Sequence, residues 1–183
     1  MIILHLPSQK VSQEYRIPYL YEGSMDDECS KAIKSCDPKG PIMMLVMRII
    51  PTEKYGFYTF GRIFSWKIEQ GVSIKILGPN YIPGKQNDLF IKEIRRVLII
   101  KERKIKDIYE VPWGNIYALD CLDKVLLSQM TLTTSSDSHI IKTKKYLKPP
   151  IIGTSIKPKN ASDLRKLFSN LSKIRKMNPS KLL

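Results

Sequence analysis

The middle of the chain is a succession of short apolar and β-branched runs separated by glycine and proline. Pro51 closes the first run, Gly56 precedes the second, and Gly71 and Gly78 bracket the third. The runs span residues 42–50, 57–64, 72–77, 89–100, 114–119, 130–134 and 141–147. Strands this short and this densely punctuated, with no helical period between them, predict a mainly β protein built on an antiparallel barrel over residues 41–147.

Residues 1–40 precede the predicted barrel. Proline and glycine recur through residues 7–40, so most of this segment is predicted to be a linker. The acidic residues 26–28 would face the positive end of a helix dipole, and a short helix is therefore expected over residues 26–36.

Residues 148–183 have a different character. One more strand is predicted over residues 151–157, followed by a helix with Asn160 as its cap and Asp163 in its first turn. An apolar stripe at helical spacing consists of Leu164, Leu167, Phe168, Leu171 and Ile174. A strand and one amphipathic helix cannot enclose a core, so this segment is predicted to be the opening piece of an incomplete α+β domain.

The chain is strongly basic. Lysine and arginine total 31 against 17 aspartates and glutamates, for a formal net charge of +14. A field of this sign attracts polyanions, and RNA is the commonest large one. A compositional bias toward lysine is the alternative, since the chain is also rich in isoleucine. The charge therefore leaves RNA binding and a solvated basic surface both open.

The potential metal ligands and nucleophiles are sparse. The odd cysteine count, Cys29, Cys36 and Cys121, argues against a disulfide framework and favours a reducing cytoplasm. His5 and His139 lie far from any cysteine cluster in sequence, so no zinc site is expected. No apolar run approaches the roughly 20 residues of a membrane span, and no membrane partner is expected. No residue pattern indicates a catalytic role.

Several motifs carry a family resemblance. HLPS at residues 5–8, LYEG at 20–23, IKSCDPKGP at 33–41 and GPNYIPGK at 78–85 resemble eukaryotic elongation factor 2, in the same order. FGRIFS at residues 60–65 resembles the signature of the second domain of translation factors, and VPWGNI at 111–116 matches a further turn. KNASDL at 159–164 resembles the opening of the third domain, so the similarity covers nearly the whole chain.

The resemblance implies a function for the longer protein. The family is a GTPase that uses GTP and magnesium to drive tRNA and messenger RNA through the ribosome. Residues 1–40 would be the last strand or exit of the GTPase domain and a linker, residues 41–147 a translation-factor-type β-barrel, and residues 148–183 a partial third domain. No phosphate-binding loop is present, because the Gly84-Lys85 pair is followed by Gln86 in place of a hydroxyl residue. The chain is therefore expected to be non-catalytic and to hold no cofactor.

The implied partners are small-subunit ribosomal RNA and the GTPase domain of the same factor. The candidate RNA contacts are Arg62, Lys85, Lys92, Lys101, Arg103, Lys104 and Lys106. Arg62 is alternatively a brace against the GTPase domain or an exposed strand arginine, and the lysines are alternatively solvated.

The sequence also departs from the family pattern. Trp66 and Cys121 stand where glycines are expected, and a basic loop at residues 101–106 replaces a more neutral one. A paralogous GTPase of the spliceosome or of ribosome assembly remains an alternative. So does a free-standing RNA-binding β-barrel.

Overall fold

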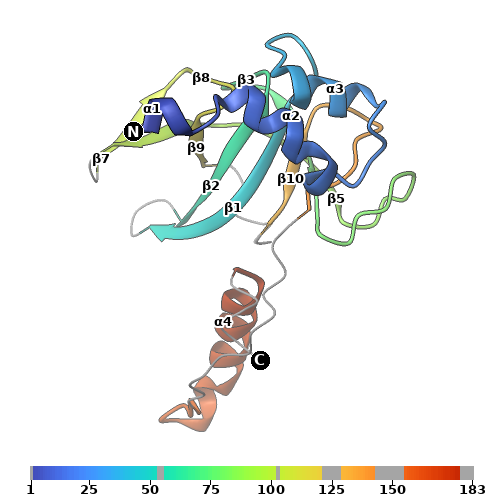
Figure 1. Cartoon of the computed structure of the whole chain (residues 1–183). Helices are drawn as coiled ribbons and strands as arrows, with labels where there is room; N and C mark the ends of the chain where they lie inside the picture. The colour runs from blue at the N-terminus through green and yellow to red at the C-terminus, as the bar shows by residue number, and fades with distance from the viewer. Residues whose placement is uncertain (1, 53–55, 102–103, 121–128, 143–154, 178–183) are drawn as a thin grey trace.

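The computed structural model describes residues 2–52, 56–101, 104–120, 129–142 and 155–177 of the 183-residue chain. It confirms a mainly β, antiparallel architecture. Figure 1 shows a curled sheet. Two helices from the N-terminal part of the chain, α2 and α3, lie together against it.

Eight strands form the main sheet, in the order β5-β4-β10-β1-β2-β9-β6-β7, and every neighbouring pair is antiparallel. The strands are β1 (Met43–Thr52), β2 (Gly56–Ser65), β4 (Ser73–Leu77), β5 (Leu89–Glu93), β6 (Val97–Lys101), β7 (Lys104–Ile108), β9 (Ile116–Leu119) and β10 (Thr131–Thr133). Strands β3 (Lys67–Glu69) and β8 (Glu110–Pro112) form a separate two-stranded sheet. Apart from β3, β7 and β8, which the sequence analysis did not assign, each strand overlaps a predicted run, although β1, β2 and β6 extend one or two residues beyond theirs.

The predicted run over residues 89–100 is divided between two strands. Strand β5 ends at Glu93 and β6 begins at Val97, and Ile94 between them is buried and donates a main-chain hydrogen bond of 2.9 Å to Val72. The chain therefore bends sharply between β5 and β6, and this single predicted run contributes one strand to each half of the curled sheet. Within the described residues, no ladder joins the two outer strands, β5 and β7.

The main core lies on the inner face of the curled sheet. Its fully buried side chains include Met44, Ile63, Ile76, Tyr117 and Leu132, which come from five different strands. Alternating inward positions from so many strands enclose one apolar interior, as the period-two pattern predicted. Trp113 is partly buried and packs against this core.

The N-terminal segment differs from the prediction of a linker. Residues Ile2–His5 form a short helix, α1, and not a strand, and Gln9–Leu20 form the 12-residue helix α2. Ser8 caps α2, and Pro18 lies inside its last turn, where it removes one intrahelical N–H donor. The recurrence of glycine and proline favoured a linker in the prediction. In the structure, Gln13 and Ile17 are four residues apart and both face the sheet, which is the spacing of a helix.

Helix α3 (Glu28–Ser35) confirms the short helix expected over residues 26–36. It ends at Cys36, whose φ of 55° and ψ of 46° place it in the left-handed region. Helices α2 and α3 share a second, outer core with strands β1 and β2, formed by Ile17, Tyr21, Cys29, Ile33, Met43, Phe64 and Ile141. Residues 9–36 are thus an integral part of the barrel's outer layer.

Trp66, at a position where the resemblance led us to expect glycine, has a backbone conformation that glycine favours. Its φ is 63°, in the left-handed region that glycine favours, and its amide donates a hydrogen bond of 2.8 Å to the carbonyl of Asp37. Cys121, the other departure from the family pattern, lies outside the described residues.

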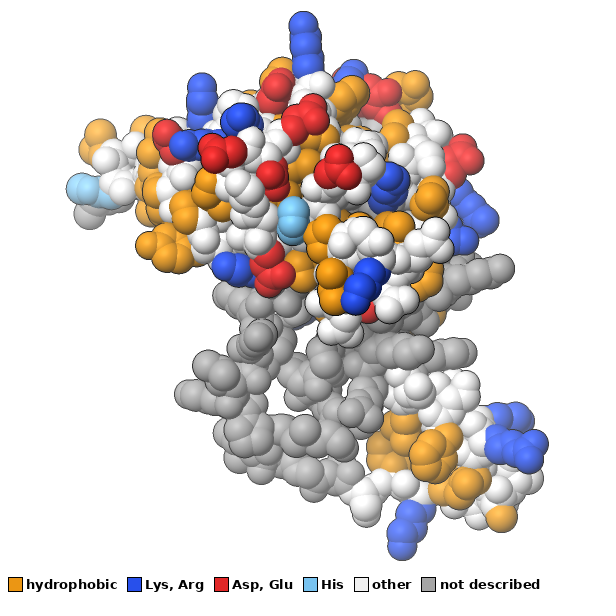
Figure 2. All heavy atoms as spheres, turned by 90° about the vertical axis from the view of Figure 1, so that its right-hand side faces the viewer, with side chains coloured by type: hydrophobic (Ala, Val, Ile, Leu, Met, Phe, Trp, Pro, Cys, Tyr) orange, Lys and Arg blue, Asp and Glu red, His pale blue; other side chains and the backbone are white. Residues whose placement is uncertain are grey.

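The C-terminal helix confirms part of the prediction for residues 148–183. A 3₁₀ turn (Ala161–Asp163) leads into α4 (Leu164–Met177), although Asn160 makes no side-chain capping bond. Residues 155–157 are not a strand, and residues 148–154 lie outside the described part. The stripe is exposed: Phe168 is 69% accessible, and hydrophobic side chains gather on this helix in Figure 2. Of the run 141–147, only Ile141 is described as paired, in a single bridge to Tyr21.

Candidate nucleic-acid interface

The hairpin of β6 and β7 carries the densest group of predicted RNA contacts. Lys101 and Lys104 are directly opposite each other near its tip, and Lys106 is opposite Ile99. All three lysines are exposed. Arg103, predicted to join them, lies outside the described residues. The hairpin is also an outer edge of the sheet, so its charged side chains face solvent on a projecting ribbon.

The carboxylates near this hairpin are already paired. Asp107 accepts two hydrogen bonds from Arg96, at 2.9 and 2.7 Å, and Glu110 pairs with Lys67 at 2.7 Å. Hydrogen bonding to Glu110 and Glu69 raises the pKa of Lys67, and that to Asp107 raises the pKa of Arg96. No ion pair involves Lys101, Lys104 or Lys106 among the described residues. Among the described residues, the hairpin lysines therefore have no acidic partner; Glu102, at the tip of the hairpin, lies outside the described residues.

The predicted contacts Lys85 and Lys92 lie elsewhere. Lys85 is exposed in the loop between β4 and β5, where its amide donates to the carbonyl of Ile82 at 3.1 Å. Lys92 is on β5, opposite Ile74. Figure 1 places this loop and the β6–β7 hairpin on opposite sides of the molecule. The predicted residues consequently do not form one continuous surface.

The face shown in Figure 2 bears acidic and basic side chains in alternation over the barrel. The net positive charge of the chain is therefore not expressed as a single-sign patch on that side. Tyr81, a possible base-stacking residue of the β4–β5 loop, is only 8% accessible and packs within its own loop. This face offers a weak case for RNA contact.

Arg62 occupies a different and more structured environment. Its guanidinium lies over the ring of Phe64, with its central carbon 5.8 Å from the ring centroid. Its Nε is buried and has no hydrogen-bond partner within the described structure. The preceding Gly61 leaves no room for a side chain, since a Cβ there would collide with the Leu45 carbonyl and the Tyr117 ring. Arg62 is thus held close against strand β1.

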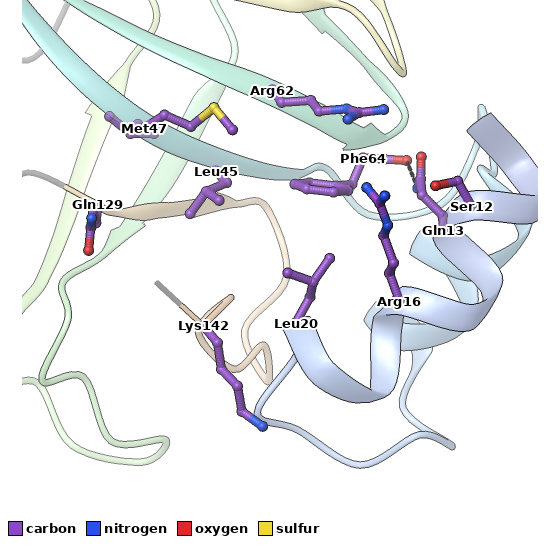
Figure 3. Close-up of a pocket in the computed structure, with 11 residues that line it drawn as sticks. Ser12, Gln13, Arg16, Leu20, Leu45, Met47, Arg62, Phe64, Gln129 and Lys142 are labelled. Carbon is purple, nitrogen blue, oxygen red and sulfur yellow. Dashed lines mark hydrogen bonds between the residues drawn. The ribbon is translucent and has the colours of Figure 1, made fainter. Parts of the chain in front are cut away.

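The Arg62 side chain lines a cleft of about 360 Å³ between α2 and strands β1 and β2. Figure 3 shows Arg62 and Arg16 both turned toward Phe64, from the strand and from the helix. The lining residues are Ser12, Gln13, Arg16, Leu20, Leu45, Val46, Met47, Arg62, Phe64, Gln129 and Lys142. Three of them are cations, none is an acid, and the wall is largely apolar. We call this set the α2 cleft.

Two register shifts between β1 and β2 shape the wall of the α2 cleft. Val46 is opposite Gly61 and Arg48 is opposite Phe60, so Met47 is an extra residue without a cross-strand partner. Phe64 is the corresponding extra residue on β2, because Met43 pairs with Ser65 and Met44 with Ile63. Such bulges re-aim side chains and are frequent beside functional sites. Both extra side chains line the cleft.

Gln13 fixes the helix that closes the cleft. Its buried amide nitrogen donates to the carbonyl of Ile33 at 2.8 Å and to that of Phe64 at 3.0 Å. Arg16 is three positions further along α2 and projects into the cleft. Sequence analysis missed Arg16 and Lys142 because it assigned a linker to the first and a strand to the second. The four-residue spacing of Gln13 and Ile17, which places both side chains on one face of a helix, was the sequence signal that could have indicated α2.

A small polar cluster ties the N-terminal segment to residues 138–142. The His139 main-chain amide donates to the Tyr21 hydroxyl at 3.1 Å, and its ring Nδ1 lies 3.5 Å from an Asp27 oxygen. Burial raises the pKa of Tyr21 to about 12. The arrangement lacks a nucleophile in contact with the histidine, and its evident effect is to hold two segments together.

The described part of the chain has neither a metal-binding group nor a membrane-spanning helix. It contains no group of three or more His, Cys, Asp or Glu side chains placed to hold a metal ion. It also contains no helix long and apolar enough to cross a membrane. A scan of the sequence against protein-family models found no match.

Proposed function

We propose that this chain is a non-catalytic part of a translation elongation factor that promotes GTP-dependent translocation of tRNA and mRNA. Its barrel would contact small-subunit ribosomal RNA and the GTPase domain of the same factor in the cytoplasm. Two features support the proposal: the ordered motifs of the elongation factor 2 family, and an antiparallel sheet whose first and last strands, β1 and β10, lie within residues 41–147.

The observation that carries the RNA contact is the β6–β7 hairpin. Its exposed lysines, Lys101, Lys104 and Lys106, form no ion pair among the described residues, where the neighbouring acids Asp107 and Glu110 are engaged by Arg96 and Lys67. Lysines on a projecting ribbon can approach phosphates and release counterions, which supplies affinity without sequence recognition. Such contacts suit an anchor on a large folded RNA.

The role proposed for this anchor is mechanical. A barrel that binds ribosomal RNA can transmit the nucleotide state of a GTPase domain only if its contacts differ between the GTP-bound and GDP-bound states. The barrel core, buried on the inner face of its sheet, is rigid enough to move as one body. GTP and magnesium would be bound by the GTPase domain, and this chain is proposed to perform no hydrolysis.

A filter-binding experiment with small-subunit ribosomal RNA tests the anchor. The variant K101E/K104E/K106E is compared with K31E/K34E/K159E, which makes the same change of charge on other exposed lysines. If three phosphate contacts are lost, the slope of log K against log salt falls by about 2–3 for the hairpin variant. Equal losses in both variants would show that only net charge matters and would remove the hairpin from the proposal.

The same assay separates the alternatives. Preference for spliceosomal RNA over small-subunit RNA would favour a paralogous spliceosomal GTPase, and preference for a precursor of ribosomal RNA an assembly factor. Tight binding at full salt by this chain alone would favour a free-standing RNA-binding barrel. GTP hydrolysis by the purified chain would contradict a non-catalytic role outright.

A further inference from the structure

We infer that the α2 cleft is a binding site for one nucleotide of single-stranded RNA. The base would lie on the apolar wall and the phosphate between Arg16 and Arg62. The inference rests on the proposed RNA contact of the barrel, but it names a second site, separate from the β6–β7 hairpin, and a different mode of recognition.

The charge of the cleft selects the sign of the ligand. Arg16, Arg62 and Lys142 come from α2, β2 and the segment after β10, and no acid is among the described residues that line the cleft. In Figure 3 the two arginines turn toward Phe64, while Lys142 stands beside Leu20. The two arginines approach from separate elements and repel each other unless an anion lies between them, whereas the Lys142 side chain extends away from them. The buried Nε of Arg62, without a partner within the described structure, is a donor available to such an anion.

The shape of the cleft selects a flat ligand. Its volume of about 360 Å³ is at the small end of ligand sites, which run from about 300 to 1,000 Å³. Leu45, Met47 and Leu20 supply an apolar wall, and the central guanidinium carbon of Arg62 lies 5.8 Å from the centroid of the Phe64 ring. Guanidinium planes and aromatic rings are the surfaces on which single-stranded RNA bases stack. A helix or strand of an acidic protein needs a longer groove than this.

The structure also argues against the chain's own exposed helix as the occupant. Helix α4 has an apolar stripe, but it carries Arg165 and Lys166 and has one acid, Asp163, in the turn before it. A basic helix approaching a cleft lined by three cations would be repelled. An anionic ligand satisfies the same apolar wall without that cost.

The Met47 methyl group reports on the cleft directly. It is the extra residue of the β1 bulge, its side chain is 56% accessible, and it lines the wall. The probe is a mixed-sequence single-stranded RNA decamer added to the full chain with ¹³C-labelled methionine methyl groups. The Met47 signal, assigned with Met47→Leu, is expected to shift on binding, and adenosine monophosphate is expected to shift it further than inorganic pyrophosphate does.

The matched variants are R16E/K142E and K31E/K159E. Each replaces two exposed cations with acids, but only the first pair lines the cleft. Losing two charged contacts is expected to weaken decamer binding by about tenfold or more in R16E/K142E. The K31E/K159E control is expected to lose clearly less. Arg62→Lys keeps the charge but removes the stacking plane, so it should abolish the advantage of adenosine monophosphate over pyrophosphate.

Several results would overturn the inference. They are an unmoved Met47 signal, equal weakening in the two double variants, or an equal Met47 shift with polyglutamate at the same charge concentration. Decamer binding that depends on the hairpin lysines while Met47 stays unmoved would reject the cleft and leave the proposed anchor intact. Absence of all RNA binding would instead reject the proposed function.

Discussion

The side-chain amide of Gln13 donates a hydrogen bond of 3.0 Å to the main-chain carbonyl of Phe64, 51 residues away along the chain. The same nitrogen also serves the carbonyl of Ile33 at 2.8 Å. One side chain therefore ties α2 to both α3 and strand β2. Because Phe64 is the extra residue of a bulge, its carbonyl lacks the regular cross-strand position, and Gln13 supplies the donor.

Replacing Gln13 with leucine tests this tie. The substitution keeps the volume nearly unchanged but removes the Gln13 donor from the carbonyls of Phe64 and Ile33, and Ile33 keeps only the Cys36 amide at 3.3 Å. We expect the free energy of unfolding in urea to fall by about 1–3 kcal/mol. Gln9→Leu is the control, because Gln9 is half-buried and its amide bonds only to Gln13, at 3.3 Å. A Gln13→Leu variant as stable as the parent would mean that α2 is held by apolar contacts alone.

The two terminal helices are expected to differ in amide exchange. Helix α2 buries Gln13 and Ile17 against the sheet, whereas α4 leaves Leu164 and Phe168 exposed. Protection follows burial and cooperative packing, so α2 amides should exchange at rates close to those of β1 and β2. The α4 amides should exchange far faster. Strong protection of α4 in the isolated chain would contradict the prediction of an incomplete C-terminal domain.

The buried thiols should react slowly. Cys29 and Cys36 are each 2% accessible, and burial raises the pKa of both. A raised pKa lowers the thiolate fraction at a given pH, and the thiolate is the reactive species. In a Cys121→Ser background, iodoacetamide at pH 8 should modify both thiols much more slowly in buffer than in urea. Equal rates in the two solvents would show that the outer core opens readily.

The strand pattern was predictable from sequence, but the cleft was not. Short apolar and β-branched runs, punctuated by glycine and proline, located β1, β2 and β4. Two features escaped it. Pro18 and Gly23 favoured a linker, although the packing of Ile17 stabilises a helix there through tertiary contacts. The bulges that place Met47 and Phe64 interrupt alternation, and only the partner strand defines them.

The predicted RNA contacts divide along the same line. The run of basic residues in the sequence was enough to locate Lys101 and Lys104, because residues this close in the chain also lie close together on one hairpin. The sequence could not show that Arg62 lines one cleft with Arg16 and Lys142. These residues are far apart in the chain and line the same cleft only through the packing of α2. Local composition can indicate a charged ribbon, whereas a cleft between elements depends on the fold.

Tyr21 should make the fold sensitive to alkaline pH. Burial raises the pKa of its phenol to about 12 from 10.0, so the folded state favours the neutral form more strongly than the unfolded chain does. This effect leaves stability unchanged below pH 10 and destabilises the fold as pH rises from about 10 to 12. Urea unfolding of Tyr21→Phe and the parent should therefore converge across that interval.

At neutral pH the Tyr21→Phe variant should be less stable by about 0.5–1.5 kcal/mol, because the His139 amide loses its 3.1 Å acceptor. Above pH 10 this deficit should shrink, since phenylalanine has no proton to lose. Tyr19→Phe is the control, because Tyr19 is 78% accessible and should show neither the neutral-pH deficit nor the alkaline convergence. A constant difference between Tyr21→Phe and the parent from pH 8 to pH 12 would place the Tyr21 hydroxyl in contact with solvent and outside the outer core.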